Sequence, residues 1–318
     1  MSETRTIEIK PRAKINLSID VVGKRPDGMH EVDMVMQAID FRDSVTVTVA
    51  GSAFPEIRIT CSRSGVPTDS GNICWKAAEL MREYARRGSS GPEDPRDLCS
   101  VMIDIQKRIP VAGGMAGGSG NGAAVLHALN ILWELGLSVS ELMDLGGKLG
   151  ADVPFCVLEL ASEDRSTAAR AGGTGTEITQ VTPLKGYVTF AKPDISVSTK
   201  EVYKGIDSCV IGSRPDNDRL TEELAACADP LDGASAEHRK AAAGEMINVL
   251  ELYTLSAEPE VAGLKEFMER ELAGAEKVLM SGSGPTVFAL FGEDSRAEAE
   301  AARERLRSAG YEAHCAAL

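Results

Sequence analysis

The sequence predicts an α+β protein with two domains, and three observations support this prediction. Segments in which apolar residues alternate with polar ones fill much of the N-terminal third. A glycine-rich stretch lies before a helical pattern near the middle, and the chain closes on a β-β-α-β pattern. The chain has 318 residues, of which 43% are hydrophobic, so it is long and apolar enough to bury a large core.

The first strand is expected around Ile15–Val21, where apolar residues alternate with polar ones so that one face is buried and Lys14 and Asn16 lie on the polar face. The turn residues 25–28 separate it from a second apolar run, Val32–Ile39. Two further segments with a period of two are 45–49 and 101–105, and the pattern of residues 73–87 predicts a helix between them.

The middle of the chain predicts a loop followed by helices. Residues 111–121 are rich in glycine, and Val125, Leu129 and Leu132 then follow at helical spacing. Ser138 and Glu141 form a capping-box pattern that opens a helix to about Leu149.

The second half predicts a smaller α+β unit. We expect a domain boundary near residue 165, giving domains 1–165 and 166–318, because residues 159–179 are polar and glycine-rich and resemble a boundary or a mobile loop. Predicted strands are 187–191, 277–280 and 286–291, with an edge strand at 312–316. Predicted helices are 221–228, 258–273, one that Ser198 and Glu201 cap, and one that Ser295 and Glu298 cap and that runs to about Ser308.

The composition narrows the classes of partner. The chain has 34 Lys and Arg residues against 48 Asp and Glu residues, a net charge of −14, which repels nucleic acid and anionic membranes. We therefore expect a small-molecule substrate, no nucleic-acid or membrane partner, and a monomer or homodimer. The same charge opposes a phosphorylated ligand, so a phosphate site must depend on local hydrogen-bond donors.

The cysteines and the N-terminus indicate a compartment. The seven cysteines include no C-x-x-C pair, the polar start MSETRTIEIKPR lacks the apolar core of a signal peptide, and no apolar run approaches the ~18 residues of a membrane span. We expect free thiols in a reducing cytoplasm.

The strongest chemical signal is the segment PVAGGMAGGSGNGAA at residues 110–124. Glycines between a strand and a helix let backbone amides converge on an anion, and the helix N-terminus adds its positive end, so the segment predicts a phosphate cradle. It is not a Walker loop, because no Lys follows at the required spacing. The alternative is a flexible glycine turn.

Other candidates are ambiguous from the residues alone. Asp152 can be a catalytic carboxylate or a turn-stabilising residue, and the residues alone favour the turn. Lys14 can neutralise charge or be a solvated strand residue. The turn at Met280–Thr286 becomes functional only if it approaches the first glycine segment, and a single loop histidine such as His30 is more often a surface group.

Taken together and in order, these segments resemble the GHMP kinases. The resemblance rests on PRAKINL at 11–17, KRPDGMHEVDMVMQAID at 24–40, VPTDSGNICWKA at 66–77, the glycine segment, LGADVPF at 149–155 and MSGSGPTVFALF at 280–291. It is greatest for the branch that phosphorylates a cytidine-diphosphate-linked polyol in isoprenoid-precursor synthesis. It implies a two-domain fold, a ribosomal protein S5 domain 2-like N-terminal domain with a ferredoxin-like C-terminal domain, and an ATP-dependent kinase that uses Mg²⁺.

The resemblance also implies residue roles. Asp152 would be the general base and Lys14 would keep it ionised. Ser119 would orient the phosphates or the metal, and no other protein side chain is assigned to Mg²⁺. The residues expected to bind ATP are Asn72, Pro110, Val111, Ala112, Gly113, Gly114, Met115, Ala116, Gly117, Gly118, Ser119 and Gly120. The residues expected to bind the alcohol substrate are Asn16, Met29, His30, Thr199, Ser281 and Gly282.

The chain departs from the family pattern at several positions. Met29 stands where members usually have a Tyr that stacks on the cytidine, Gly120 and Gly122 replace Ser and Ala, and residues 158–177 match poorly. Two alternatives therefore stay open: a GHMP kinase for another small alcohol, such as homoserine or mevalonate, and a catalytically silent nucleotide- or metabolite-binding homologue.

Overall fold

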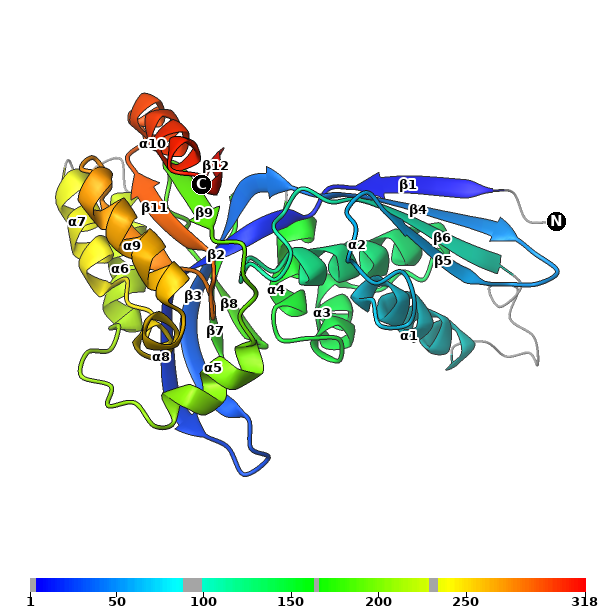
Figure 1. The fold of residues 1–318 in the computed structure, drawn as a ribbon. Helices are drawn as coiled ribbons and strands as arrows, with labels where there is room; N and C mark the ends of the chain where they lie inside the picture. Colours follow the sequence, from blue (N-terminus) through cyan, green and yellow to red (C-terminus); the bar gives the residue numbers. More distant parts are fainter. Residues whose placement is uncertain (1–3, 88–98, 163–165, 229–233) are drawn as a thin grey trace. The chain divides into compact units, whose positions relative to one another are not determined.

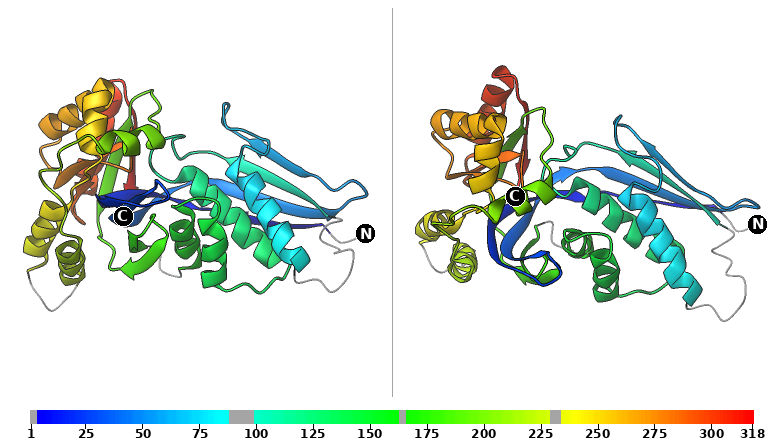
Figure 2. Two further views of the ribbon diagram at one scale, coloured as in Figure 1. Left: turned by 90° about the horizontal axis from the view of Figure 1, so that it is seen from below. Right: turned by 60° about the horizontal axis from the view of Figure 1, so that its bottom comes forward.

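The structure, a computed structural model, describes residues 4–87, 99–162, 166–228 and 234–318 (Figures 1 and 2). It contains two compact units that are discontinuous in sequence. Unit 1 comprises residues 1–13, 41–111 and 116–163, and unit 2 comprises residues 14–40, 112–115 and 164–318. The domain boundary expected at residue 165 falls outside the described residues and stays a prediction.

Unit 1 is a four-stranded sheet with helices on one face. The strand order is β1 (Arg5–Ile9), β4 (Ser44–Gly51), β6 (Cys99–Gln106) and β5 (Ile57–Cys61), and only β5 and β6 are parallel. The helices are α1 (Ile73–Arg87), α2 (Gly117–Leu132), α3 (Val139–Gly147) and α4 (Val153–Ala161) (Figure 1). Val101, Ile103 and Ile105 of β6 are buried beneath them, whereas Met102 is 39% exposed, which confirms the predicted period of two.

Unit 2 contains two four-stranded antiparallel sheets. One has the order β2 (Arg12–Lys24), β3 (His30–Arg42), β7 (Ala168–Gly172) and β8 (Glu177–Val181), of which β2 and β3 lie mostly in this unit. The other has the order β10 (Lys277–Met280), β11 (Val287–Phe291), β9 (Tyr187–Lys192) and β12 (Glu312–Ala317). The helices are α5 (Thr199–Ile206), α6 (Asn217–Cys227), α7 (Ser235–Glu245), α8 (Glu251–Ala257), α9 (Pro259–Glu271) and α10 (Arg296–Ser308). The predicted closing β-β-α-β pattern and its edge strand are confirmed.

Two predictions of local structure were wrong for tertiary reasons. The strand expected to have one buried face is buried on both, because Asn16 and Ser18 are fully covered and Lys14 is only 4% exposed. Residues 159–179, for which we expected a boundary or a mobile loop, include β7 and the start of β8, so the mobile-loop alternative was wrong. Ala168, Ala169 and Ala171 of β7 are fully buried and pair with β3. Small alanine side chains permit that close packing, but they carry little strand signal.

Two of the three predicted helix caps are present in the structure. Ser138 and Glu141 form the predicted capping box, and the Ser198 side chain accepts the Glu201 amide. Ser295 begins α10 without such a bond, because its backbone lies at φ −98° and ψ 33°, outside the extended region that aims a cap side chain at the helix. The sequence did not predict β1, β5, α4, α7 or α8.

His127 makes a partly buried contact between two helices of unit 1. Its Nε2 donates to the Val157 carbonyl of α4 at 3.1 Å, and burial lowers the pKa of the ring, partly offset by that hydrogen bond. A depressed folded-state pKa means that the unfolded chain binds the proton more readily, so stability is present above the ordinary pKa of 6.5 and is lost as pH falls.

We therefore expect the free energy of unfolding to decrease when the pH is lowered from about 7.5 to 5.5, with His127 contributing at most about 1.4 kcal/mol per pH unit. His127→Gln keeps an N–H donor but cannot titrate, so it should flatten this slope. Chemical denaturation of both proteins across the pH range measures it. Equal slopes would assign the pH dependence to other groups.

Candidate active site

The glycine-rich segment has an alternating backbone conformation. Ala112 at φ 53°, Gly114 at φ 70° and Ala116 at φ 54° lie in the left-handed region, and the residues between them do not. Such alternation turns successive amides toward the same side and forms an anion-binding concavity. Left-handed backbone costs an alanine roughly 1–2 kcal/mol, so the surrounding structure must hold this conformation in place.

Helix α2 begins inside the glycine segment, at Gly117, with Ala116 as its N-cap. The Gly120 amide donates to the Ala116 carbonyl at 2.8 Å, which leaves the amides of residues 117–119 without helical acceptors. Gly118 is exposed, and a Cβ there would meet only the Ile73 side chain at 3.9 Å. A Cβ on Gly117 would instead lie 2.6 Å from the Lys107 Nζ and 2.9 Å from the Ile109 Cγ2. The open side of this helix start is therefore at Gly118.

In unit 2, the turn at 281–284 does approach the first glycine segment, as its functional interpretation requires. The Ser281 hydroxyl donates to the Gly114 carbonyl at 3.0 Å. A Cβ on Gly114 would lie 2.3 Å from the Ser281 carbonyl oxygen, and one on Gly282 would lie 3.1 Å from the Gly114 oxygen. Glycine is required at Gly114 on both conformational and steric grounds.

Lys14 and Asn16 lie beside this contact and are not solvated. The Lys14 amide donates to the Met115 carbonyl at 3.1 Å, and its Nζ donates to the Asn16 Oδ1 at 2.6 Å. Both side chains are buried, so the interpretation of Lys14 as an exposed strand residue was wrong. Unit 2 thus brings together six predicted site residues: Lys14, Asn16, Gly114, Met115, Ser281 and Gly282.

Three residues that the sequence did not single out hold the 281–284 turn. The Asn248 side chain donates to the carbonyls of Met280 and Gly282, each at 2.8 Å, and Thr254 donates to the Ser283 carbonyl at 3.3 Å. Glu251 accepts the Met280 amide at 2.8 Å. The available signal was a lone Asn within the apolar run Met246–Leu250, since an amide in such a run is buried only when it is hydrogen-bonded.

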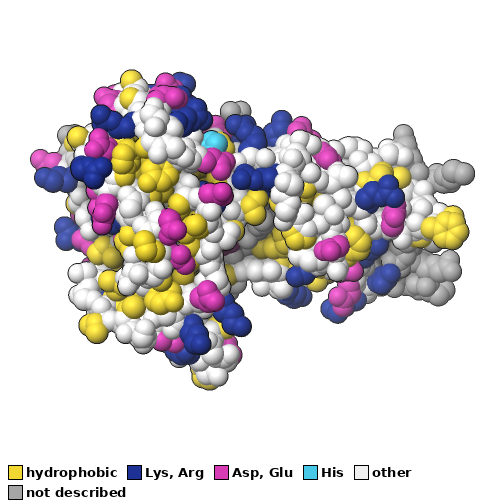
Figure 3. Space-filling view, viewed as in Figure 1, with side chains coloured by type: hydrophobic (Ala, Val, Ile, Leu, Met, Phe, Trp, Pro, Cys, Tyr) yellow, Lys and Arg dark blue, Asp and Glu magenta, His cyan; other side chains and the backbone are white. Residues whose placement is uncertain are grey.

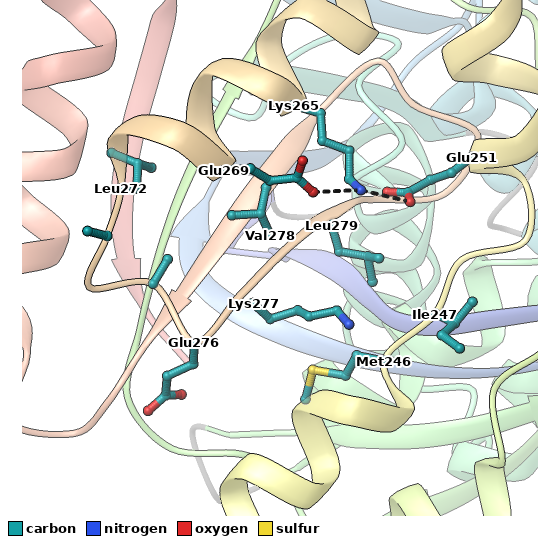
Figure 4. A pocket seen from close by; sticks show the side chains of 12 residues that line it. Met246, Ile247, Glu251, Lys265, Glu269, Leu272, Glu276, Lys277, Val278 and Leu279 are labelled. Carbon is teal, nitrogen blue, oxygen red and sulfur yellow. Dashed lines mark ion pairs between the residues drawn. The ribbon is translucent and has the colours of Figure 1, made fainter. Parts of the chain in front are cut away.

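Glu251 also lines a cavity of about 420 Å³ together with β10 and α9 (Figure 4). Lys265 lies between Glu251, at 3.2 Å, and Glu269, at 3.0 Å. Burial raises the pKa of the Glu251 carboxyl, and Lys265 offsets part of that effect. This network fixes the carboxylate that holds Met280, one residue before the turn.

A second group of predicted residues lies elsewhere in unit 2. The His30 Nε2 is 2.6 Å from the Asp207 Oδ1, and the His30 ring centroid is 5.3 Å from that of Tyr203 in α5. Hydrogen bonds from Lys24 and then His30 lower the pKa of the Asp207 carboxyl. Met29 is 52% exposed, and Thr199 shares a hydrogen bond of 2.9 Å with Ser283. Thr199 therefore belongs with the glycine contact, and Tyr203 supplies an aromatic face that the sequence analysis missed.

Asp152 and Asn72 both lie in unit 1. Asp152 is the half-buried N-cap residue of α4, yet its side chain makes no capping hydrogen bond, so that helix does not account for its carboxylate. The Asn72 side chain accepts the Cys74 amide at 2.9 Å and donates to the Pro67 carbonyl at 2.6 Å. Because Lys14 belongs to unit 2, its pairing with Asp152 stays a prediction.

On the face that Figure 3 shows, Lys and Arg side chains are interspersed with Asp and Glu. Among the described residues, no cluster of three or more His, Cys, Asp and Glu side chains is arranged to hold a metal ion. No helix in the described ranges is long and apolar enough to span a membrane. All seven cysteines are free.

Comparisons with known proteins assign the family. Residues 72–159 match the GHMP kinases N terminal domain, and residues 232–312 match the GHMP kinases C terminal domain. A 4-diphosphocytidyl-2-C-methyl-D-erythritol kinase from Alkaliphilus metalliredigens is 42% identical over 92% of this chain and 91% of its own. The chain belongs to the GHMP kinase family. It is therefore an ATP-dependent small-molecule kinase.

Further similar proteins support the same family assignment. A 4-diphosphocytidyl-2-C-methyl-D-erythritol kinase from Geobacillus kaustophilus is 44% identical over 91% of this chain and 90% of its own. The crystal structure of a 4-(cytidine 5'-diphospho)-2C-methyl-D-erythritol kinase matches with a TM-score of 0.73 and 28% identity over 98% of both chains. A homoserine kinase from Cytophaga hutchinsonii, with a TM-score of 0.67 and 16% identity over 98% of this chain and 94% of its own, shares the fold. The predicted two-domain GHMP kinase fold is confirmed.

The helix start offers a direct test of phosphate binding. Gly118→Val should weaken ATP binding by about 10-fold or more, because the valine side chain occupies the open face of the helix start. Few protein atoms lie near that position, so the fold should tolerate the substitution. Calorimetric titration measures the ATP affinity of the variant, and thermal unfolding measures its stability. Gly263→Val is the matched control, since that helical glycine also has open space around it. Unchanged ATP affinity in Gly118→Val would make the segment only a turn.

Proposed function

We propose that the protein transfers the γ-phosphoryl group of ATP to the 2-hydroxyl of 4-diphosphocytidyl-2-C-methyl-D-erythritol, giving the 2-phosphate and ADP, in isoprenoid-precursor synthesis. The observation that carries the proposal is the contact of Gly114 with Ser281, beside the buried Lys14–Asn16 pair. This contact joins the segment expected to bind phosphate to residues expected to bind the alcohol substrate. The chain matches kinases of this name along about nine-tenths of its length.

The ATP phosphates bind the amides of residues 112–120. Support comes from the alternating left-handed conformation and from the first-turn amides of α2, which supply donors without a net positive surface. Mg²⁺ fits this assignment as an ion carried by the phosphates, with the Ser119 hydroxyl in the first turn as its candidate protein contact. When bound there, the ion would supply positive charge to the transferring phosphoryl group. Asn72 is assigned to the nucleotide at the start of α1.

Asp152 accepts the proton of the attacking hydroxyl. Support comes from its position at the start of α4, with a side chain that does not cap the helix. Lys14 of unit 2 holds its ammonium in a buried site. We assign to it the roles of keeping Asp152 ionised and of stabilising charge on the reacting oxygen. Phosphoryl transfer needs mainly positioning and charge stabilisation, which these groups provide.

The cytidine end of the substrate binds at His30. The ring is oriented by Asp207 and has Tyr203 beside it, so a donor or acceptor nitrogen and a flat aromatic face are available together. Tyr203 thereby supplies the stacking surface that Met29 lacks, and Met29 contributes an apolar contact. Asn16, Thr199, Ser281 and Gly282 hold the polyol and its phosphates.

A coupled assay of ADP release tests the function. We expect ADP release to depend on the cytidine-diphosphate alcohol and to be absent with homoserine or mevalonate, because only the first ligand has a base for the His30–Tyr203 site. Turnover of another alcohol instead would identify a different GHMP kinase. Tight nucleotide binding without turnover of any alcohol would identify a silent binding protein.

Asp152→Asn tests the general base. The amide has the size of the carboxylate but cannot take the proton, so turnover should fall by about 10²–10⁴-fold while ATP affinity is retained. The exposed Asp144 of α3 provides the control variant Asp144→Asn, which should leave turnover unchanged. Steady-state rates and ATP titrations of the three proteins decide the assignment, and near-normal turnover of Asp152→Asn would refute it.

A further inference from the structure

Asp43, the single residue between β3 and β4, has a fully buried carboxylate in unit 1. Its Oδ1 accepts the amides of Arg108 and Ile109 at 2.7 and 2.8 Å, and its Oδ2 forms an ion pair with Lys107. A charge taken out of water is tolerated only when it is paired and hydrogen-bonded, and Asp43 meets both conditions.

These partners are the three residues that lead directly into Pro110 and the glycine-rich segment. The Lys107 ammonium also lies against the middle of that segment, because a Cβ on Gly117 would lie 2.6 Å from its Nζ. The ion pair therefore contacts the chain directly before the segment and, within it, the first residue of α2.

The backbone of Asp43 adds a third connection. Its amide donates to the Pro11 carbonyl at 3.2 Å, and the Pro11 side chain faces Gly120, where a Cβ would lie 3.2 Å from the Pro11 Cβ. The first turn of α2 is thus bounded by residues that Asp43 or its ion pair fixes.

Stability alone is a weak reason for this arrangement, since replacing a buried ion pair by apolar residues of similar volume is often neutral or stabilising. Apolar residues, however, cannot accept two consecutive amides or hold an ammonium against a glycine. The Lys107 ammonium is bound to the Asp43 carboxylate and lies against Gly117, so the pair acts on a ligand through the segment it contacts.

We propose that the Asp43–Lys107 ion pair positions the glycine-rich segment, so that the first-turn amides of α2 are aimed at the ATP phosphates. The inference rests on the proposed function for its ligand, but not for its structural readout. Asp43 and Lys107 are positioning residues, because neither contacts the reacting groups.

The test uses the double variant Asp43→Asn/Lys107→Met. Asn keeps an oxygen for the amides of Arg108 and Ile109, Met keeps apolar volume, and neither leaves an unpaired buried charge. The affinity for a non-hydrolysable ATP analogue should fall by about 10- to 100-fold, and the KM for the alcohol should be unchanged. Hydrogen exchange of the Gly120 amide, which donates to the Ala116 carbonyl in the first turn of α2, should accelerate.

The control is Arg12→Met/Glu159→Gln, which removes an equally buried ion pair of the same unit, with N–O 3.1 Å and side chains 5% and 7% exposed, that joins β2 to α4. It should alter thermal stability without changing exchange of the Gly120 amide. Unchanged exchange and unchanged ATP affinity in the Asp43/Lys107 variant would overturn the inference. A wild-type protein that binds no ATP would defeat the proposed function, while the exchange measurement still decides whether the ion pair positions the segment.

Discussion

The contact between Gly114 and the turn at 281–284 leaves no room for a side chain on Gly114. Several hydrogen bonds within unit 2 hold this contact in place. Backbone meets backbone there, so van der Waals contact and one hydroxyl hydrogen bond replace side-chain packing. Asn248, Thr254 and Glu251 fix the turn from the other side through its own carbonyls and through the amide of Met280. A strained arrangement of this kind persists because several independent contacts with the surrounding structure hold it in place.

Charge is the second constraint. A chain with a net charge of −14 that uses a polyphosphate must overcome its own field locally. In the phosphate site that we propose, backbone amides do this without adding cations to the surface. The ammonium groups of Lys14 and Lys107 lie below the surface, where water screens them less. The global acidity and the local phosphate chemistry are therefore compatible.

The sequence predicted what depends on neighbours in the chain. Period-two strands, the capping box at Ser138 and both glycine turns follow from local rules, and the resemblance to GHMP kinases supplied the roles of Lys14 and Asp152. Prediction from the sequence failed where contacts with distant segments determine burial and strand pairing. Asn16 and Ser18 resemble an exposed polar face until other elements cover them, and the alanines of β7 carry no strong strand signal. Asp43 and Asn248 act on residues 65 and 32 positions away, which no local pattern encodes.

The two left-handed alanines, Ala112 and Ala116, carry a consequence for the thermodynamics of binding. A segment built only of glycine would sample many conformations, and a ligand would have to select one of them at an entropic cost. Each methyl group removes conformations from that ensemble, and the strain it introduces is already compensated when the chain folds. The folded protein therefore presents a preorganised segment, and little of the intrinsic binding free energy is lost in ordering it.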